Sequence, residues 1–202
     1  GATGYLGGAV ARTLAETGTA LRLLARRPEA VPELPGAVAT RIAYADTEEV
    51  RAALAGVETL FMVSAHESPE RVGEHRGLID AAAAAGVRHV VYTSFYGASA
   101  QAAFTLSRDH GLTEAYLRES GMGWTFLRDN FYMDFFVELC TQGGEIRGPA
   151  GDGVCSAVTR ADVAAVAAVV LREPGRWAGR VLDLNGPEDL SMATVAATVG
   201  GR

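Results

Sequence analysis

The chain has 202 residues, 49% of them hydrophobic and 21% charged, which is the balance of a globular domain with a sizeable core. Its 24 acidic and 18 basic side chains give a formal net charge of −6, which argues against a nucleic-acid partner because such binding depends on a basic surface. No apolar stretch reaches the roughly 20 residues that span a bilayer, and the chain starts without a signal-peptide pattern. We therefore expect no membrane span and a cytoplasmic location.

Apolar strands and amphipathic helices alternate along the chain, with short turns between them. The expected strands are 20–25, 37–44, 57–64, 87–94, 123–128 and 180–184. The expected helices are 7–18, 46–56 with Asp46 as its cap, 69–86, 105–120, 131–140, an alanine-rich helix capped by Asp162, and a last helix from Ser191. This alternation predicts an α/β fold with a parallel sheet. The spacing becomes irregular after residue 128.

The chain begins inside a glycine-rich motif that normally follows a buried strand. We therefore expect a core strand of roughly five or six residues before Gly1. The last helix also stops abruptly near the end of the sequence. The expected organisation is a single domain over 1–202, truncated at both ends. In it, 1–128 form a nucleotide-binding core without its first strand, and 129–202 hold the last core elements and part of a substrate-binding region.

The opening stretch GATGYLGG places Gly1, Gly4 and Gly7 at regular spacing, with Thr3, Tyr5 and Leu6 between them. Glycines allow a sharp turn and a close approach to a pyrophosphate, while the helix that follows points its N-terminus at the negative charge. The alternative is a flexible turn, which would not require glycines at this period. Because the loop opens a helix and heads a regular series of strands and helices, it predicts a dinucleotide site.

The end of the 20–25 strand selects between the two nicotinamide dinucleotides. An NAD site would place an acid there, about 20 residues beyond the loop. This sequence places Arg26 and Arg27 there, and no acid comes before Glu29. Arginine suits the 2′-phosphate of NADP, so we expect NADPH to be preferred over NADH. The alternative is a solvated turn.

Several stretches together resemble the NmrA-like branch of the atypical short-chain dehydrogenase/reductase family, most closely its type 2 NAD(P)H:quinone oxidoreductases. They are GATGYLGGAV, LLARRPE, AYAD, EHRGLIDAAAAAGVRHVVYTS, TFLRDNFYMDFF and GPAGDGVCSAVTRADVAAVAAVVLREPG. The resemblance covers nearly the whole chain. It implies a Rossmann-type, doubly wound parallel sheet that binds NADP, with a small, mostly C-terminal substrate region.

The resemblance also implies roles for individual residues. Asp46 would contact the adenine. Ser64, Ala65, His66 and Glu67 would pass beneath the cofactor. The nicotinamide and substrate pocket would be lined by Asp129, Asn130, Phe131, Tyr132 and Arg160. Thr93 and Ser94 are well placed at the carboxyl end of the 87–94 strand, where ligands bind in such sheets.

The catalytic apparatus is harder to predict. The sequence contains no lysine, so a Tyr/Lys pair is absent, and Tyr116 is followed four residues later by Ser120. His110 and Glu114 lie one turn apart on the expected 105–120 helix. His110 is the candidate proton donor to a reduced carbonyl or quinone oxygen; the alternative is a surface or half-buried helix pair. The remaining histidines show no metal-ligand spacing, so we expect no metal.

Three functions fit these features. The first is an NADPH-dependent reductase of a quinone or similar carbonyl, in which the aromatic cluster at 131–136 either forms a flat wall for the quinone or belongs to the core. The second is a non-catalytic NADP(H)-binding redox sensor that acts through a protein partner. The third, a sugar-nucleotide epimerase, is disfavoured because it normally uses the missing tyrosine and lysine. A homodimer remains open.

Overall fold

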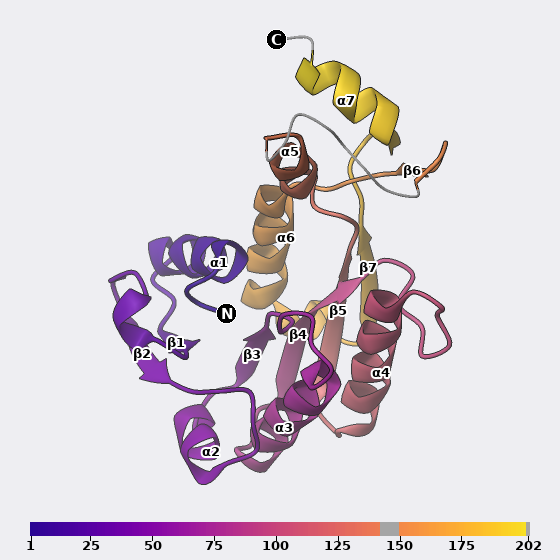
Figure 1. The fold of residues 1–202 in the computed structure, drawn as a ribbon. Coiled ribbons are helices and arrows are strands. Elements are labelled where there is room, and N and C mark those ends of the chain that lie inside the picture. The colour runs from indigo at the N-terminus through magenta and orange to yellow at the C-terminus, as the bar shows by residue number, and fades with distance from the viewer. Residues whose placement is uncertain (142–149, 201–202) are drawn as a thin grey trace.

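The structure is a computed structural model that describes residues 1–141 and 150–200 (Figure 1). Its helices are α1 (Tyr5–Glu16), α2 (Glu48–Leu54), α3 (Arg71–Ala84), α4 (Thr105–Glu119), α5 (Met133–Thr141), α6 (Arg160–Arg172) and α7 (Met192–Gly200). Its strands are β1 (Leu21–Ala25), β2 (Ala37–Arg41), β3 (Thr59–Met62), β4 (His89–Phe95), β5 (Gly123–Asp129), β6 (Val154–Cys155), β7 (Arg180–Leu184) and β8 (Leu190–Ser191).

The central sheet is parallel, with the strand order β3-β4-β5-β7, and β1 and β2 form a separate parallel pair. Helices cover both faces: α2, α3 and α4 pack on one, and α1 and α6 on the other (Figure 1). The side chains of β4 alternate accordingly, because Val90 and Tyr92 belong to the first core and Val91 to the second. The predicted α/β fold with a Rossmann-type, doubly wound sheet is confirmed.

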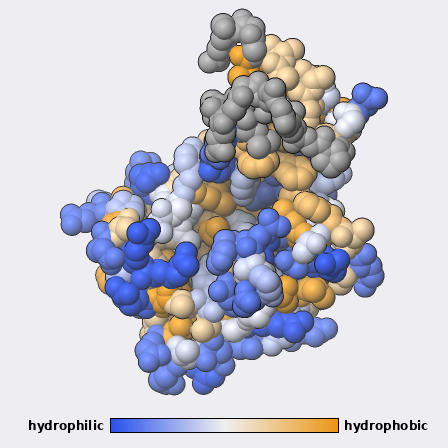
Figure 2. All heavy atoms as spheres, viewed as in Figure 1, coloured by the Kyte–Doolittle hydropathy of each residue, from blue (hydrophilic) through white to orange (hydrophobic). Residues whose placement is uncertain are grey.

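The C-terminal part adds a smaller assembly beside this sheet. β6 and β8 pair antiparallel, and Phe136 of α5 packs with Ala157 and Val195 of α7. Figure 2 shows the face seen in Figure 1, where hydrophilic side chains dominate the lower part and α7 presents a mainly hydrophobic surface. Residues 142–149 lie outside the described part of the chain, and β6 follows them.

The predicted helices form, but two of the predicted caps are wrong. The cap of α2 is Thr47, whose Oγ1 accepts a hydrogen bond from a backbone N–H of the first turn, whereas Asp46 is held by Arg51. The cap of α6 is Thr159, which accepts from the N–H of Asp162 at 3.0 Å and donates to its carboxylate at 2.7 Å. Both acids lie within a few residues of the cap and stabilise the helix start through its dipole or its cap hydroxyl.

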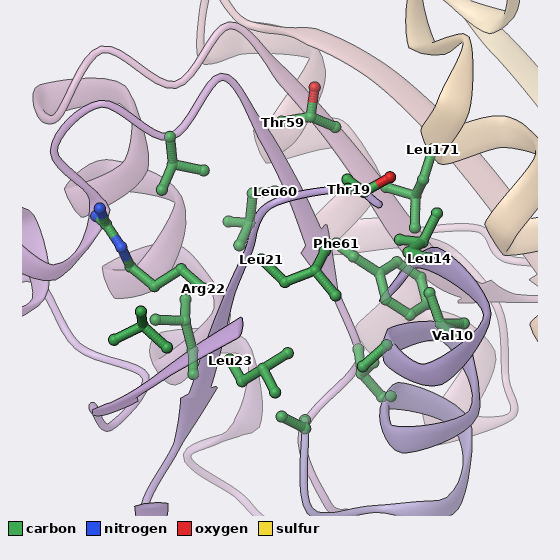
Figure 3. Close-up of a pocket in the computed structure, with 18 of the residues that line it drawn as sticks. Val10, Leu14, Thr19, Leu21, Arg22, Leu23, Thr59, Leu60, Phe61 and Leu171 are labelled. Atoms are coloured by element: carbon green, nitrogen blue, oxygen red, sulfur yellow. The ribbon is translucent and has the colours of Figure 1, made fainter. Parts of the chain in front are cut away.

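A slot separates β1 from β3, which do not pair with each other (Figure 3). It encloses about 770 Å³ and is lined mostly by apolar side chains, among them Val10, Leu14, Leu21, Leu23 and Phe61. The N–H of Ala2 donates to the carbonyl of Leu24 at 3.4 Å, so the first residues lie at the carboxyl end of β1. Because the slot runs between strand edges and carries few polar groups, we do not treat it as a cofactor pocket.

Candidate functional site: a dinucleotide loop beside a buried polar network

The glycine loop forms a closed turn in front of α1. The N–H of Gly4 donates to the carbonyl of Gly1 at 3.0 Å, and Gly4 precedes the helix without a side-chain cap. A Cβ atom on Gly7 would lie 2.3 Å from that same carbonyl oxygen, which no side chain can tolerate, whereas one on Gly4 would lie at 3.4 Å. Gly7 is therefore required by the turn itself, and the open N-terminus of α1 suits a pyrophosphate.

Arg26 and Arg27 follow β1 directly and are exposed. The N–H of Ala2 donates to the carbonyl of Leu24 near the end of β1, so the glycine loop lies beside the strand end that Arg26 follows. Glu29, the nearest acid in sequence, pairs with Arg41 instead, at 3.8 Å. The two arginines are thus placed beside the loop that would hold the pyrophosphate, as a 2′-phosphate contact requires.

Asp46 lies on the surface after β2. Arg51 donates to both of its carboxylate oxygens, at 2.7 and 2.6 Å, and these bonds lower the pKa of Asp46. The carboxylate is ionised and held in one orientation. The adenine contact implied by the resemblance stays a prediction.

The loop after β3 is fixed by its backbone. The N–H of Ser64 donates to Thr93 Oγ1 at 2.8 Å, and the N–H of Ala65 donates to His75 Nε2 at 2.9 Å. His75 is fully buried, and burial, with the charge of Arg71, lowers its pKa to about 3. It is therefore a neutral acceptor that anchors the loop, a role that the sequence did not indicate. His66 and Glu67, further along the same loop, are exposed.

His110 is 3% exposed, so the alternative of a surface or half-buried residue is wrong. Its Nε2 lies 3.0 Å from Nη2 of Arg71, and its Nδ1 lies 2.8 Å from the hydroxyl of Tyr92. Since a guanidinium can only donate, Nε2 accepts, and a neutral ring must carry its proton on Nδ1. Burial, followed by the charges of Arg71 and His75, holds the pKa of His110 well below its usual value.

This environment contradicts the predicted role of His110 as a charged proton donor. An imidazolium would have no acceptor at Nε2 and would face a guanidinium in a buried place. His110 instead links α3, α4 and β4 as a neutral ring.

Glu114, the other member of the predicted pair, ties α4 to the sheet. It is 1% exposed, accepts from Ser94 at 2.6 Å, and receives two bonds from Arg128, at 2.8 and 2.7 Å. Arg118 adds a third cationic contact at 3.2 Å. The hydroxyl proton of Ser94 is therefore used in a structural hydrogen bond. The negative charge of the Glu114 carboxylate is balanced by its two arginine partners.

Of the predicted pocket residues, Arg160 reaches the first turn of α1, while Asp129 and Tyr132 bond to each other. The hydroxyl of Tyr132 donates to one oxygen of Asp129 at 2.7 Å, the other oxygen has no partner, and burial raises the pKa of Asp129 to about 7. The guanidinium of Arg160 lies over the ring of Tyr5, 5.0 Å from its centre. Asn130 is fixed by a bond to Asn185 at 2.8 Å.

A second cavity, of about 390 Å³, opens at the carboxyl ends of β4 and β5. Phe95 and Phe131 line it and meet edge to face, with ring centres 5.3 Å apart. Phe104, from the start of α4, packs on Phe95 at 5.9 Å. The aromatic cluster at 131–136 was expected either to form a wall for a quinone or to belong to the core. Phe136 is buried in the core, whereas Phe131 faces the cavity. The sequence did not lead us to expect Phe95 in a pocket. Its position directly after the expected 87–94 strand could have indicated this.

Two absences can be reported for the described residues, 1–141 and 150–200. No helix there is long and apolar enough to cross a bilayer. No three or more histidine, cysteine or acidic side chains gather there in a way that could hold a metal ion.

The glycine turn before an open helix, with arginines at the end of the next strand, defines a dinucleotide-binding protein of the Rossmann type. A family model described as NAD(P)H-binding matches residues 1–174, and the chain belongs to that family. It is similar to quinone oxidoreductase 2 of Escherichia coli, with 36% identity over 98% of this chain and 71% of that protein. An NAD(P)H azoreductase of Xenophilus azovorans is 34% identical over 98% of this chain and 71% of its own.

A solved structure shows the same fold. The crystal structure of an NADPH-dependent quinone oxidoreductase of Escherichia coli in complex with NADPH matches with a TM-score of 0.90 and 33% identity. The match covers 100% of this chain and 74% of that chain. These findings confirm the resemblance predicted from the sequence.

Proposed function

We propose that the chain is an NADPH-dependent oxidoreductase that reduces a quinone or a similar conjugated carbonyl by hydride transfer. The observation that carries the acceptor class is the cavity at the carboxyl ends of β4 and β5, where Phe95 and Phe131 lie among polar side chains. An aromatic ring beside polar groups suits a planar acceptor that carries oxygen atoms. The similar proteins whose names are quinone oxidoreductase and azoreductase support the same class.

The residues of the loop fit the cofactor. The turn closed by Gly7 leaves the amides at the start of α1 open for a pyrophosphate, and Arg26 and Arg27 offer two cations for a 2′-phosphate. The backbone bonds of Ser64 and Ala65 hold the loop on which the cofactor would rest. When bound, a reduced nicotinamide supplies the hydride.

The chain's own residues then position the acceptor. Phe95 and Phe131 present their rings to it, and the bond between Asn130 and Asn185 keeps the end of β5 in place. Because His110 is neutral and its Nε2 accepts from Arg71, we assign the proton that completes the reduction to solvent. No tyrosine–lysine pair is needed for this chemistry, which removes the objection raised by the absence of lysine.

The test mixes the purified chain with NADPH and a panel of quinones and follows the absorbance of the reduced nicotinamide. Turnover well above the blank without protein is the expected result. Tight binding of NADPH without turnover of any acceptor would replace this proposal with the redox sensor. The matched control is Gly4→Val, which should remove binding and turnover together while the chain stays folded.

Three expectations stay predictions. They are the cytoplasmic location, the homodimer, and the division of the chain into a core that lacks its first strand and a substrate region. The apolar slot between β1 and β3 supports the last of these, because it offers two unpaired parallel edges to an extended segment (Figure 3).

A further inference from the structure

The cavity at the carboxyl ends of β4 and β5 carries an acid on its wall. Asp189 lies one residue before β8 and lines this cavity together with the rings of Phe95 and Phe131. The residue is exposed, so a ligand in the cavity can reach its carboxylate. Neither the glycine loop nor the buried network around His110 uses this side chain.

The surrounding backbone holds Asp189 in place. The antiparallel pairing of β6 with β8 brings Ser156 beside Asp189, and the hydroxyl of Ser156 donates to one oxygen of the carboxylate. The N–H of Gly186 donates to the carbonyl of Ser156 at 2.9 Å. A Cβ atom on Gly186 would lie 2.0 Å from the carbonyl oxygen of Ala157, so the segment is packed closely. The carboxylate is therefore preorganised, which lowers the entropy cost of binding a ligand.

The second oxygen of the Asp189 carboxylate accepts no hydrogen bond from the described part of the chain, and no described residue forms an ion pair with it. The described residues that line the cavity include no arginine, lysine or histidine. The wall therefore presents a negative charge without a cation to balance it. A ligand that displaces water from this oxygen must supply a hydrogen-bond donor or a positive charge in return.

Exposed aromatic rings on the same wall favour a positive charge as well. Tyr96 is 47% exposed and Phe131 is 37% exposed, and both line the cavity. The faces of aromatic rings attract cations because the ring quadrupole is negative there. A carboxylate beside exposed rings is a combination that recognises organic cations, whereas an anionic group would meet the carboxylate without any cation nearby.

The wall also offers a donor to a carbonyl oxygen. Asn185 lies directly after β7, and its side-chain oxygen accepts from Asn130 at 2.8 Å. Its amide N–H groups have no partner in the described part of the chain, and the residue lines the cavity. These groups can donate to the oxygen of a quinone. Asn185 and Asp189 thus supply two different kinds of contact on one segment.

We propose that Asp189 determines the specificity of the acceptor site by selecting conjugated acceptors that carry a positively charged substituent, such as an alkylammonium group. The cation lies against the second carboxylate oxygen and beside the rings of Phe131 and Tyr96, while an acceptor oxygen accepts from Asn185. The inference rests on the proposed function and names the substrate class of the same site. The contact is present before hydride transfer, so it acts on binding and on KM more than on kcat.

The first test measures binding without turnover. Three naphthoquinone probes share one short alkyl chain, which ends in an ammonium group, in its uncharged N-acetyl derivative, or in a sulfonate. Isothermal titration of the full chain with oxidised NADP present gives their dissociation constants. The ammonium probe should bind about three- to tenfold more tightly than the acetylated probe, and the sulfonate should bind most weakly. Added salt should reduce these differences, because the carboxylate is exposed.

The second test assigns the preference to one side chain. Asp189→Asn removes the charge at nearly the same size and should make the ammonium and acetylated probes bind equally. Asp189→Glu keeps the charge and should retain part of the preference, and Ser156→Ala, which releases the carboxylate, should weaken it. The matched control is Glu188→Gln, which removes a neighbouring exposed acid that does not line the cavity and should leave the preference unchanged. Thermal unfolding checks that each variant folds.

Steady-state kinetics with NADPH complete the test. Asp189→Asn should raise the KM of the ammonium probe about three- to tenfold, with kcat and the KM of the acetylated probe nearly unchanged. Equal affinity of the unmodified chain for the ammonium and acetylated probes would overturn the inference, as would a preference that survives in Asp189→Asn. A chain that prefers the ammonium probe through Asp189 but reduces none of the three keeps this site and loses the proposed function. A chain that reduces all three with the same KM keeps the function and loses this site.

Discussion

The glycine loop with its arginines and the buried network around His110 differ in how their charges are held. At the loop, Arg26 and Arg27 are exposed beside the glycine turn. In the buried network, Arg71, His110 and Glu114 are nearly inaccessible, and their hydrogen bonds join the three elements α3, α4 and β4. A ligand with phosphate groups can order the exposed arginines when it binds. The buried network is already ordered by its own hydrogen bonds without a ligand.

The difference has an energetic consequence. Exposed charges contribute little to stability, so changing them should alter binding and leave folding unchanged. Buried polar groups interact strongly with their neighbours, so changing them should alter stability, its pH dependence, or turnover. The following variants test this division, beginning with the largest expected effect.

Gly7→Val should remove NADPH binding and destabilise the chain, because a Cβ atom would lie 2.3 Å from the carbonyl oxygen of Gly1. Gly4→Val should lose NADPH while keeping the unfolding midpoint, since its Cβ contact is an ordinary 3.4 Å. Titration by nicotinamide fluorescence and thermal unfolding measure the two effects. Gly73→Ala, with no atom within 4 Å, is the control. Equal midpoints for Gly4→Val and Gly7→Val would contradict the steric argument.

Asp129→Asn should stabilise the chain at high pH. The folded pKa of Asp129 is raised to about 7, above the unfolded value, so its neutral form favours folding at low pH and the benefit is lost as the pH rises through 7. The asparagine variant should match the unmodified chain near about pH 4 and exceed it by about 2–4 kcal/mol near about pH 8. Urea unfolding at several pH values measures this. A difference that does not vary with pH would refute it.

Replacing Arg26 and Arg27 together by alanine should remove most of the preference for NADPH over NADH. One charge-assisted contact contributes about 1.5–3 kcal/mol, so the ratio of dissociation constants should change tenfold or more. The unfolding midpoint should be unchanged because both side chains are exposed. Arg172→Ala, at the end of α6, is the control. The prediction fails if the unmodified chain binds both dinucleotides equally.

Asp46→Ala should have the smallest effect. It releases an exposed ion pair with Arg51, so the unfolding midpoint should not change measurably. If Asp46 contacts the adenine, the dissociation constants of NADH and NADPH should rise together by about two- to tenfold. Arg51→Ala, which leaves the carboxylate in place, is the comparison. A loss confined to NADPH would instead assign Asp46 to the 2′-phosphate side of the site.

Local features of the sequence were sufficient to predict the glycine turn and the helix that follows it. The regularly spaced glycines, the helix that follows them and the arginines after 20–25 are close together in the sequence. Their spacing therefore determines how they lie relative to one another. The strands 37–44 and 57–64 were predicted too long, and Asp46 and Asp162 were assigned as caps in place of Thr47 and Thr159. These errors are of one to three residues. The cap errors arise because nearby polar residues compete for the cap position, and only the backbone geometry selects one.

The sequence by itself determined the alternation of strands and helices, the parallel sheet, the dinucleotide loop and the NAD(P)H-binding family. Only the tertiary structure decided the state of His110, the anchoring role of His75 and the burial of Arg71. These depend on contacts between residues such as Arg71 and His110, 39 positions apart, and on the burial that their packing creates. Periodicity specifies which face of an element is apolar, but the protonation state of a buried side chain depends on every group that packs around it.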